Sequence, residues 1–120
     1  MRWKQFGQIR KIRENDIVED AIFFMKEHLK RRLTLEKLAK EAELSASHFS
    51  LVFRKKTGRA PMDYLIHLRI QKACQLLDAT GLRIKEVALH VGYDDPYYFS
   101  RIFKKVMSLS PVEYKKKPKG

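Results

Sequence analysis

The sequence predicts an all-α fold, in which two helix-turn-helix units are joined by a long connecting helix, with about seven helices in total. Apolar residues recur at helical spacing over nearly the whole chain after residue 15, and no segment has the alternation typical of a strand. The four prolines stand where they can begin helices or lie near the chain end. The chain also repeats itself at a separation of about 50 residues, which predicts two copies of one small helical unit.

A first helix is expected at about residues 17–29, with Asp16 as its N-cap. The preceding residues 1–15 are basic and are interpreted as an N-terminal extension or linker, which leaves 16–120 as the domain proper. Three roles stay open for this extension, namely a linker, a fraying helix and a nonspecific arm for nucleic acid.

The repeat is visible in the apolar and turn positions of the two copies. Residues 35–42 match residues 49 positions further along the chain, whereas residues from 50 onward match residues 50 positions further along. The turn of the second copy therefore holds one additional residue, as turns tolerate insertions. Each copy has a short helix, a tight turn and a longer helix, which predicts helix-turn-helix units at about 33–57 and 82–107. The matching pairs are Leu35 and Ile84, Leu38 and Val87, Ala39 and Ala88, Ala42 and Val91, Ser50 and Ser100, Phe53 and Phe103, Pro61 and Pro111, and Tyr64 and Tyr114.

The longer helix of each unit carries its own start signal. Ser45 is the expected N-cap of a helix over 46–56, and Asp95 followed by Pro96 predicts the start of its counterpart. In the turns before these helices, Gly92 can adopt a positive φ, whereas Glu43 at the matching position would be strained or take another geometry.

Charge narrows the class of partner. The 120 residues contain 26 Lys and Arg against 14 Asp and Glu, a formal net charge of +12, so nucleic acid is the first partner to consider. An anionic membrane surface is the rival, but no apolar run approaches the roughly 18 residues of a spanning helix. The N-terminus also lacks the apolar core of a signal peptide, so a cytoplasmic, nucleoid-associated location is expected.

The connecting helix is expected at about 61–79, beginning at Pro61 and burying a stripe that includes Leu65, Leu68 and Ala73. At about 1.5 Å per residue it would run roughly 28 Å, which is comparable to the roughly 34 Å between successive major grooves on one side of DNA. One chain could therefore place two reading helices in adjacent grooves.

The cysteine and the histidines of the sequence give little support for a catalytic site or a metal site. Cys74 is the only cysteine, so no intrachain disulfide can form, and its helical context favours a small buried apolar side chain over a nucleophile. The four histidines fall on separate predicted helices without paired metal-binding spacing. We expect no metal, no cofactor and no enzymatic activity.

Two segments carry a resemblance to a known family. LSASHFSLVFRKKTGRAPMDYL and VGYDDPYYFSRIFKKVMSLSPVEYK resemble the two signature segments of AraC/XylS-type bacterial transcription regulators. The resemblance implies two helix-turn-helix units that bind double-stranded DNA. It also implies RNA polymerase, and a sensor or dimerisation domain outside this chain, as candidate partners. Leu51 and Ser108 depart from the family pattern, in which a polar or basic residue and a glycine are usual.

The exposed faces of the two longer helices supply the candidate DNA contacts. Arg101 is the expected base reader, because Arg forms bidentate contacts with guanine, and a solvated surface charge is the alternative. Only one of Tyr97 and Tyr98 is expected to face DNA, since the other can belong partly to the core. The full set is Ala46, Ser47, Ser50, Leu51, Arg54 and Lys55 in the first unit, and Pro96, Tyr97, Tyr98, Arg101, Lys104 and Lys105 in the second.

The function expected from these observations is that of a sequence-specific DNA-binding transcription regulator, and specifically an activator. A nonspecific basic DNA tether, or a protein-interaction module of a larger protein, is the alternative, because a fold does not fix a function.

Overall fold

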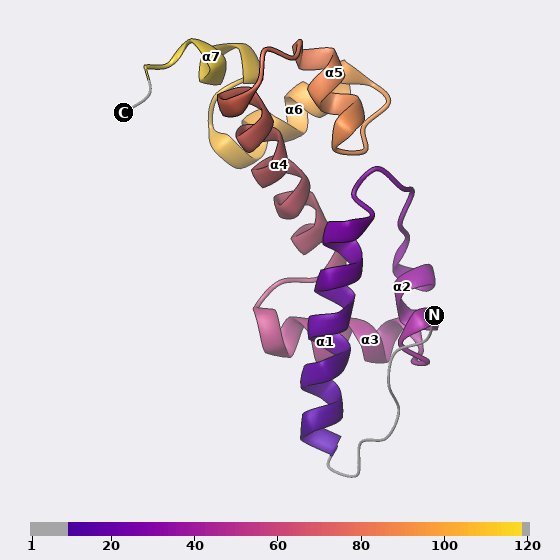
Figure 1. Cartoon of the computed structure of the whole chain (residues 1–120). Helices are drawn as coiled ribbons and strands as arrows, with labels where there is room; N and C mark the ends of the chain where they lie inside the picture. Colours follow the sequence, from indigo (N-terminus) through magenta and orange to yellow (C-terminus); the bar gives the residue numbers. More distant parts are fainter. Residues whose placement is uncertain (1–9, 119–120) are drawn as a thin grey trace. The chain divides into compact units, whose positions relative to one another are not determined.

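The computed structural model describes residues 10–118, and within them it contains seven α-helices and no strand (Figure 1). The predicted all-α architecture is confirmed. The helices are α1 (Arg10–Glu27), α2 (Leu35–Glu41), α3 (Ala46–Thr57), α4 (Pro61–Ala79), α5 (Ile84–His90), α6 (Pro96–Met107) and α7 (Pro111–Lys116).

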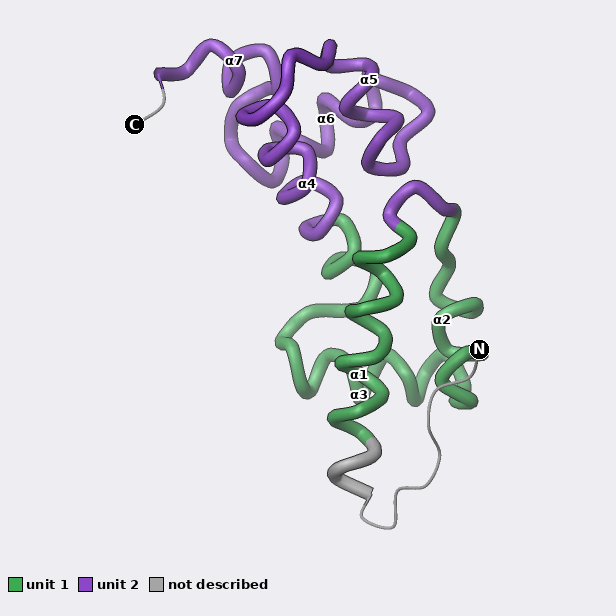
Figure 2. The backbone as a smooth tube through the Cα atoms, in the orientation of Figure 1, with its two compact units in different colours: residues 1–28, 32–66 green, residues 29–31, 67–120 purple. Residues whose placement is uncertain are grey.

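The chain forms two compact units (Figure 2). Among the described residues, the first holds 10–28 and 32–66, and the second holds 29–31 and 67–118. Helix α4 therefore contributes its first turns to one unit and its remaining turns to the other. The connecting helix was predicted with these same bounds, from Pro61 to Ala79.

In the first unit α1 and α2 both pack on α3. Ala21 of α1 and Ala39 of α2 are buried. Side chains as small as these allow neighbouring helices to approach closely. The core of this unit is formed by apolar side chains from all of these helices and from the start of α4, namely Ile17, Val18, Ala21, Met25, Leu38, Ala39, Ala42, Phe49, Val52, Phe53 and Leu65.

Helix α1 differs from the prediction at its beginning. It starts at Arg10, so Asp16 lies inside the helix and is not its N-cap. The physical reason is that Arg, Lys and Glu before Asp16 have high helix propensity, and the helix extends through them. Residues 1–9 of the predicted extension lie outside the described residues, and the proposed domain boundary stays a prediction. The other end is also earlier than predicted, at Glu27 rather than near 29.

The repeat found in the sequence is repeated in the packing of aromatic rings. Phe53 meets Tyr64 with the ring centroids 5.3 Å apart, and the matching pair in the second unit, Phe103 and Tyr114, lies at 5.6 Å, both edge to face. Phe103 is fully buried, as is Phe53. Each unit therefore anchors its longer helix to the helix that follows by the same aromatic contact.

The N-caps predicted for the two longer helices are confirmed. The backbone N–H of His48 donates to Ser45 Oγ at 3.1 Å, and the N–H of Tyr97 donates to Asp95 Oδ1 at 2.9 Å. Pro96 is the first residue of α6, where its missing N–H costs no hydrogen bond. These local contacts set the first turn of each longer helix, which is the part that carries Ser47 in α3 and Tyr97 in α6.

Among residues 10–118, four adopt a positive φ, and they occupy matching positions in the two units. The turn before the longer helix has Glu43 at 60° in the first unit and Gly92 at 100° in the second. The end of the longer helix has Gly58 at 84° and Ser108 at 69°. Each unit thus places a glycine at one of these positions and a residue with a side chain at the other, where the left-handed conformation is strained.

Replacing Ser108 with glycine is expected to stabilise the protein by about 0.5–1 kcal/mol, because relief of the left-handed strain exceeds the added entropy of the unfolded chain. The midpoint of urea unfolding measures this effect. Ser108→Ala is the matched control, since it removes the hydroxyl but keeps the strain, and it should not stabilise. A glycine variant no more stable than the alanine variant would contradict the prediction.

Candidate nucleic-acid interface

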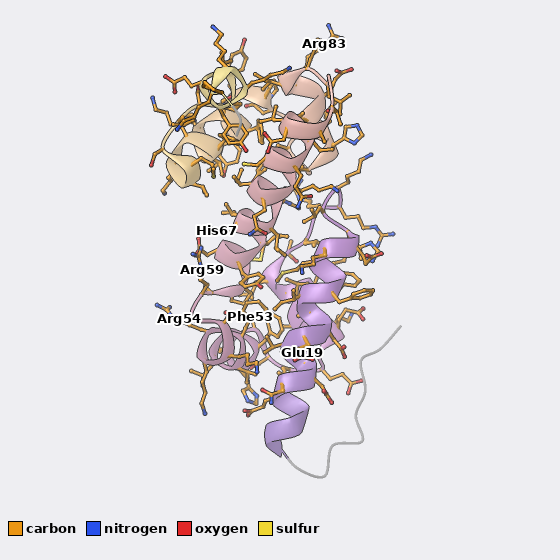
Figure 3. The ribbon with its side chains drawn as sticks, turned by 60° about the vertical axis from the view of Figure 1, so that its left-hand side comes forward. Glu19, Phe53, Arg54, Arg59, His67 and Arg83 are labelled. Atoms are coloured by element: carbon orange, nitrogen blue, oxygen red, sulfur yellow. The ribbon has the colours of Figure 1, made fainter. Side chains whose placement is uncertain are left out.

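Helix α3 presents one apolar face to the core and one mixed face to solvent. Phe49, Val52 and Phe53 are buried, whereas Leu51 is 67% exposed. Figure 3 shows Phe53 among the helices of the first unit and Arg54 at its outer edge. Leu51 therefore faces outward, as the periodicity predicts. Of the other candidate contacts, Ser47, Arg54 and Lys55 are exposed on this outer side, whereas Ser50 is half-buried at its edge and Ala46 is half-buried towards the core.

Helix α6 has the same two-sided design. Phe99 and Phe103 are fully buried, and the half-buried Ile102 and Val106 complete the inner stripe. Asp95 is the N-cap of this helix and Pro96 is its first residue. The predicted outer residues are all exposed apart from the half-buried Pro96, namely Tyr97, Tyr98, Arg101, Lys104 and Lys105.

The two tyrosines at the start of α6 have different surroundings. Tyr97 is 82% exposed, whereas Tyr98 is 43% exposed and its ring centroid lies 5.9 Å from that of Tyr93. The Cζ atom of Arg101 lies 5.7 Å from the centre of the Tyr98 ring. Tyr97 is thus the tyrosine whose whole ring is available to a partner.

The charges near these helices are unevenly distributed. The last turn of α3 carries Arg54, Lys55 and Lys56, and the last turn of α6 carries Lys104 and Lys105. Cations there also interact favourably with the helix dipole, which is a structural role they would have without any ligand. In α1, by contrast, the exposed side opposite the core carries Asp16, Glu19 and Glu27 together with Lys26 and Phe23. The cations that would attract a polyanion are therefore concentrated at the end of α3 and not on this side of α1.

One residue of the second unit was missed by the sequence analysis. Arg69 Nη2 donates to the backbone oxygen of Arg31 at 2.9 Å, and Arg69 Cζ lies 5.5 Å from the centre of the Tyr93 ring. A signal was available, because position 69 stands four residues from both Leu65 and Ala73, in the middle of a buried stripe. A cation at such a position indicates a partner elsewhere in the fold.

The described part of the chain contains no cluster of metal-binding side chains. Within residues 10–118 no three His, Cys, Asp or Glu side chains gather where they could hold a metal ion. Cys74 is half-buried, so the prediction of a buried position holds only in part. Over the same residues no helix has the length and apolar character needed to cross a membrane.

Comparison with known proteins identifies relatives over most of the chain. The MmsAB operon regulatory protein of Pseudomonas aeruginosa is 45% identical over 114 residues, which are 94% of this chain and 37% of that protein. The lactose operon transcription activator of Staphylococcus xylosus is 34% identical over 101 residues, which are 84% of this chain and 36% of that protein. The chain thus spans little more than a third of the length of these curated relatives.

Solved structures share the fold. The C-terminal domain of AraT, a response regulator from Geobacillus stearothermophilus, has a TM-score of 0.80 and 37% identity, with 83% of this chain and 84% of that chain covered. The DNA-binding domain of AdpA, a global transcriptional factor solved in complex with a target DNA, has a TM-score of 0.78 and 31% identity, with 82% and 88% covered.

The family model described as a helix-turn-helix domain matches residues 38–117, which cover most of the first unit of the repeat and all of the second. This match agrees with the two signature segments, the confirmed caps and the shared fold of the solved structures. The chain belongs to the AraC/XylS-type family of helix-turn-helix transcription regulators.

Proposed function

We propose that the chain is the sequence-specific DNA-binding domain of a transcription regulator, and that this regulator is an activator. The observation that carries the proposal is the repeated unit, in which α3 and α6 each bury an aromatic stripe and present a polar and basic face. The AdpA domain, which has the same fold, was solved with its target DNA. RNA polymerase, and a sensor or dimerisation domain outside this chain, are the further partners proposed.

Within this function the exposed residues divide into two roles. Arg101 reads guanine in the major groove, because its guanidinium can donate two hydrogen bonds to O6 and N7. Tyr97 contacts phosphate or a thymine methyl group at the start of α6. The lysines in the last turns of α3 and α6 bind phosphates, which adds affinity without information about sequence.

A nonspecific basic tether is the second candidate, and the net charge of +12 is the observation that favours it. Phosphate contacts alone would give steep salt dependence with equal affinity for all sequences. The two candidates therefore differ in sequence preference and not in their response to salt.

Selection of bound sites from random duplex DNA tests the proposal. We expect an enriched sequence, bound at 1:1 stoichiometry with protection of about two helical turns, because both reading helices and α4 lie in one chain. Footprinting and titration measure the two quantities. Recovery of unenriched sequence would favour the tether, whereas protection of a single groove or obligate two-to-one binding would contradict the model of two grooves per chain.

The two units are expected to read DNA unequally. The outer face of α3 carries Leu51 among short side chains, so apolar contact with thymine methyl groups is its main means of discrimination. Replacing Leu51 with arginine should leave the free energy of unfolding nearly unchanged, since the side chain is exposed, and should add a preference for guanine in this half-site. Site selection with the variant measures the change, and an unaltered site profile or an unfolded variant would refute the assignment.

A further inference from the structure

A continuous series of contacts leads to Arg101 through the second unit. It begins at the backbone oxygen of Arg31, which accepts the hydrogen bond from Arg69. The Arg69 guanidinium lies over the Tyr93 ring, the Tyr93 ring lies beside the Tyr98 ring, and Arg101 lies over the Tyr98 ring. The successive separations are 2.9, 5.5, 5.9 and 5.7 Å. Each cation-to-ring distance is within the range of about 6 Å at which a cation is attracted to an aromatic face.

The inner end of this series is held firmly. Tyr93 is only 8% exposed, and its ring also lies 5.7 Å from that of Phe99 in the core. Gly92 lies so close to the backbone oxygen of Leu29 that a β-carbon would not fit there. The Tyr93 phenol is neutral at physiological pH, and burial raises its pKa further, while its ring offers Arg69 an aromatic face. The position of the Tyr93 ring is therefore set by the core and not by solvent.

At the exposed end of this series, the contact with Tyr98 can position the Arg101 side chain. Arg101 is exposed and has several rotatable bonds, so an unsupported guanidinium would lose much conformational freedom on contacting a base. Tyr98 stands three residues before Arg101 on α6 and offers it the face of a ring. A stacked guanidinium keeps its N–H edges free, because cation–π contact uses the face and base recognition uses the edge.

We propose that Tyr98 is a positioning residue for Arg101, and that Arg69 and Tyr93 in turn hold Tyr98 against the core. Tyr98 then acts on DNA through Arg101, while the exposed Tyr97 makes the direct contact. The inference rests on the proposed function, since it assumes that Arg101 reads a base. Direct contact between Tyr98 and DNA is the competing explanation of its 43% exposure.

The experiment uses the duplex selected by the whole chain and its single base-pair variants. Arg101→Ala first identifies the base pair that Arg101 reads, as the pair at which discrimination is lost. Discrimination at that pair is then measured as a ratio, namely the dissociation constant for the duplex substituted at that pair divided by the dissociation constant for the selected duplex. Tyr98→Leu removes the aromatic face and should lower this ratio by about two- to fivefold, whereas Tyr98→Phe keeps the ring and should leave it unchanged.

The same ratio tests the inner contacts. Arg69→Lys keeps the charge but loses the planar guanidinium, and it should lower the ratio about twofold. Arg83→Lys is the matched control, because the Arg83 side chain is exposed and its ion pair is with Glu86. It should leave the ratio unchanged. Thermal unfolding midpoints of all variants separate these effects from loss of the fold.

A double-mutant cycle decides between positioning and direct contact. The cycle is measured on the dissociation constant for the selected duplex, because Arg101→Ala has already abolished the ratio at this pair. On the Arg101→Ala background, Tyr98→Leu should not weaken binding to the selected duplex further, because its action passes through Arg101. Equal weakening on both backgrounds, or an equal loss of affinity for both duplexes on the original background, would overturn the proposal in favour of direct contact. If Arg101→Ala removes discrimination but Tyr98→Leu leaves discrimination unchanged, the positioning proposal fails, and the role of Arg101 as base reader stands. If Arg101→Ala alters discrimination at no base pair, the assignment of Arg101 as base reader fails as well.

Discussion

Replacing Gly92 with alanine is expected to destabilise the protein by about 2–5 kcal/mol, the sum of left-handed strain and overpacking. Gly92 has a φ of 100°, which L-residues with a side chain rarely adopt. A β-carbon at this position would collide with the backbone oxygen of Leu29 and would lie 3.0 Å from Arg69 Cζ. The backbone oxygen cannot move away as the end of a flexible side chain could, so the backbone at Leu29 or at Gly92 would have to shift.

Gly58→Ala is the matched control for this prediction. Gly58 also has a positive φ, 84°, but a β-carbon there would meet no atom within 4 Å. Its replacement should therefore cost only the strain, about 1–2 kcal/mol. Chemical denaturation of both variants measures the difference. Equal destabilisation by the two substitutions would show that the close approach of residues 29–31 to Gly92 has no energetic weight.

Replacing Arg101 with alanine is expected to lose about 1–3 kcal/mol of discrimination at one base pair and little at the others. Arg101 lies in the middle of α6 on the exposed face, where a long side chain can reach a base edge. Competition binding with a panel of single base-pair variants of the selected duplex measures this loss.

Lys104→Ala is the matched control, because Lys104 is exposed on the same helix but lies in its last turn. It should weaken binding to all sequences alike and reduce the slope of log affinity against log salt by about 1, as expected for one lost phosphate contact. If Arg101→Ala also weakened every sequence equally, Arg101 would be a phosphate contact and not a base reader.

Much of the fold and of the candidate interface was predictable, because the signals involved are local. Helical periodicity predicted the buried Phe99 and Phe103 and the exposed Leu51, and the structure confirms their burial and exposure. Ser45 and Asp95 were predicted as caps because a cap bonds to a backbone group only two or three residues away. The internal repeat and the signature segments then indicated the family.

Other features depended on contacts that no local pattern reveals. Helix α1 begins at Arg10 because the residues before Asp16 also have high helix propensity. The prediction of Asp16 as N-cap did not take these residues into account. Tyr97 and Tyr98 are adjacent and chemically identical in the sequence, and only the packing of Tyr93 distinguishes them. Arg69 donates a hydrogen bond to a backbone oxygen 38 residues earlier in the chain. Every residue has such an oxygen, so the sequence does not indicate which one accepts.

The sequence by itself determined the all-α class, the two repeated units, the inner and outer faces of their longer helices, and the family. These follow from spacing and capping within a few residues. Only the tertiary structure decided which of the two tyrosines is the more exposed, and that Arg69 joins Arg31 to the Tyr93 ring. The physical reason is that these features are set by packing between segments distant in the chain, which can distinguish two adjacent side chains of the same type.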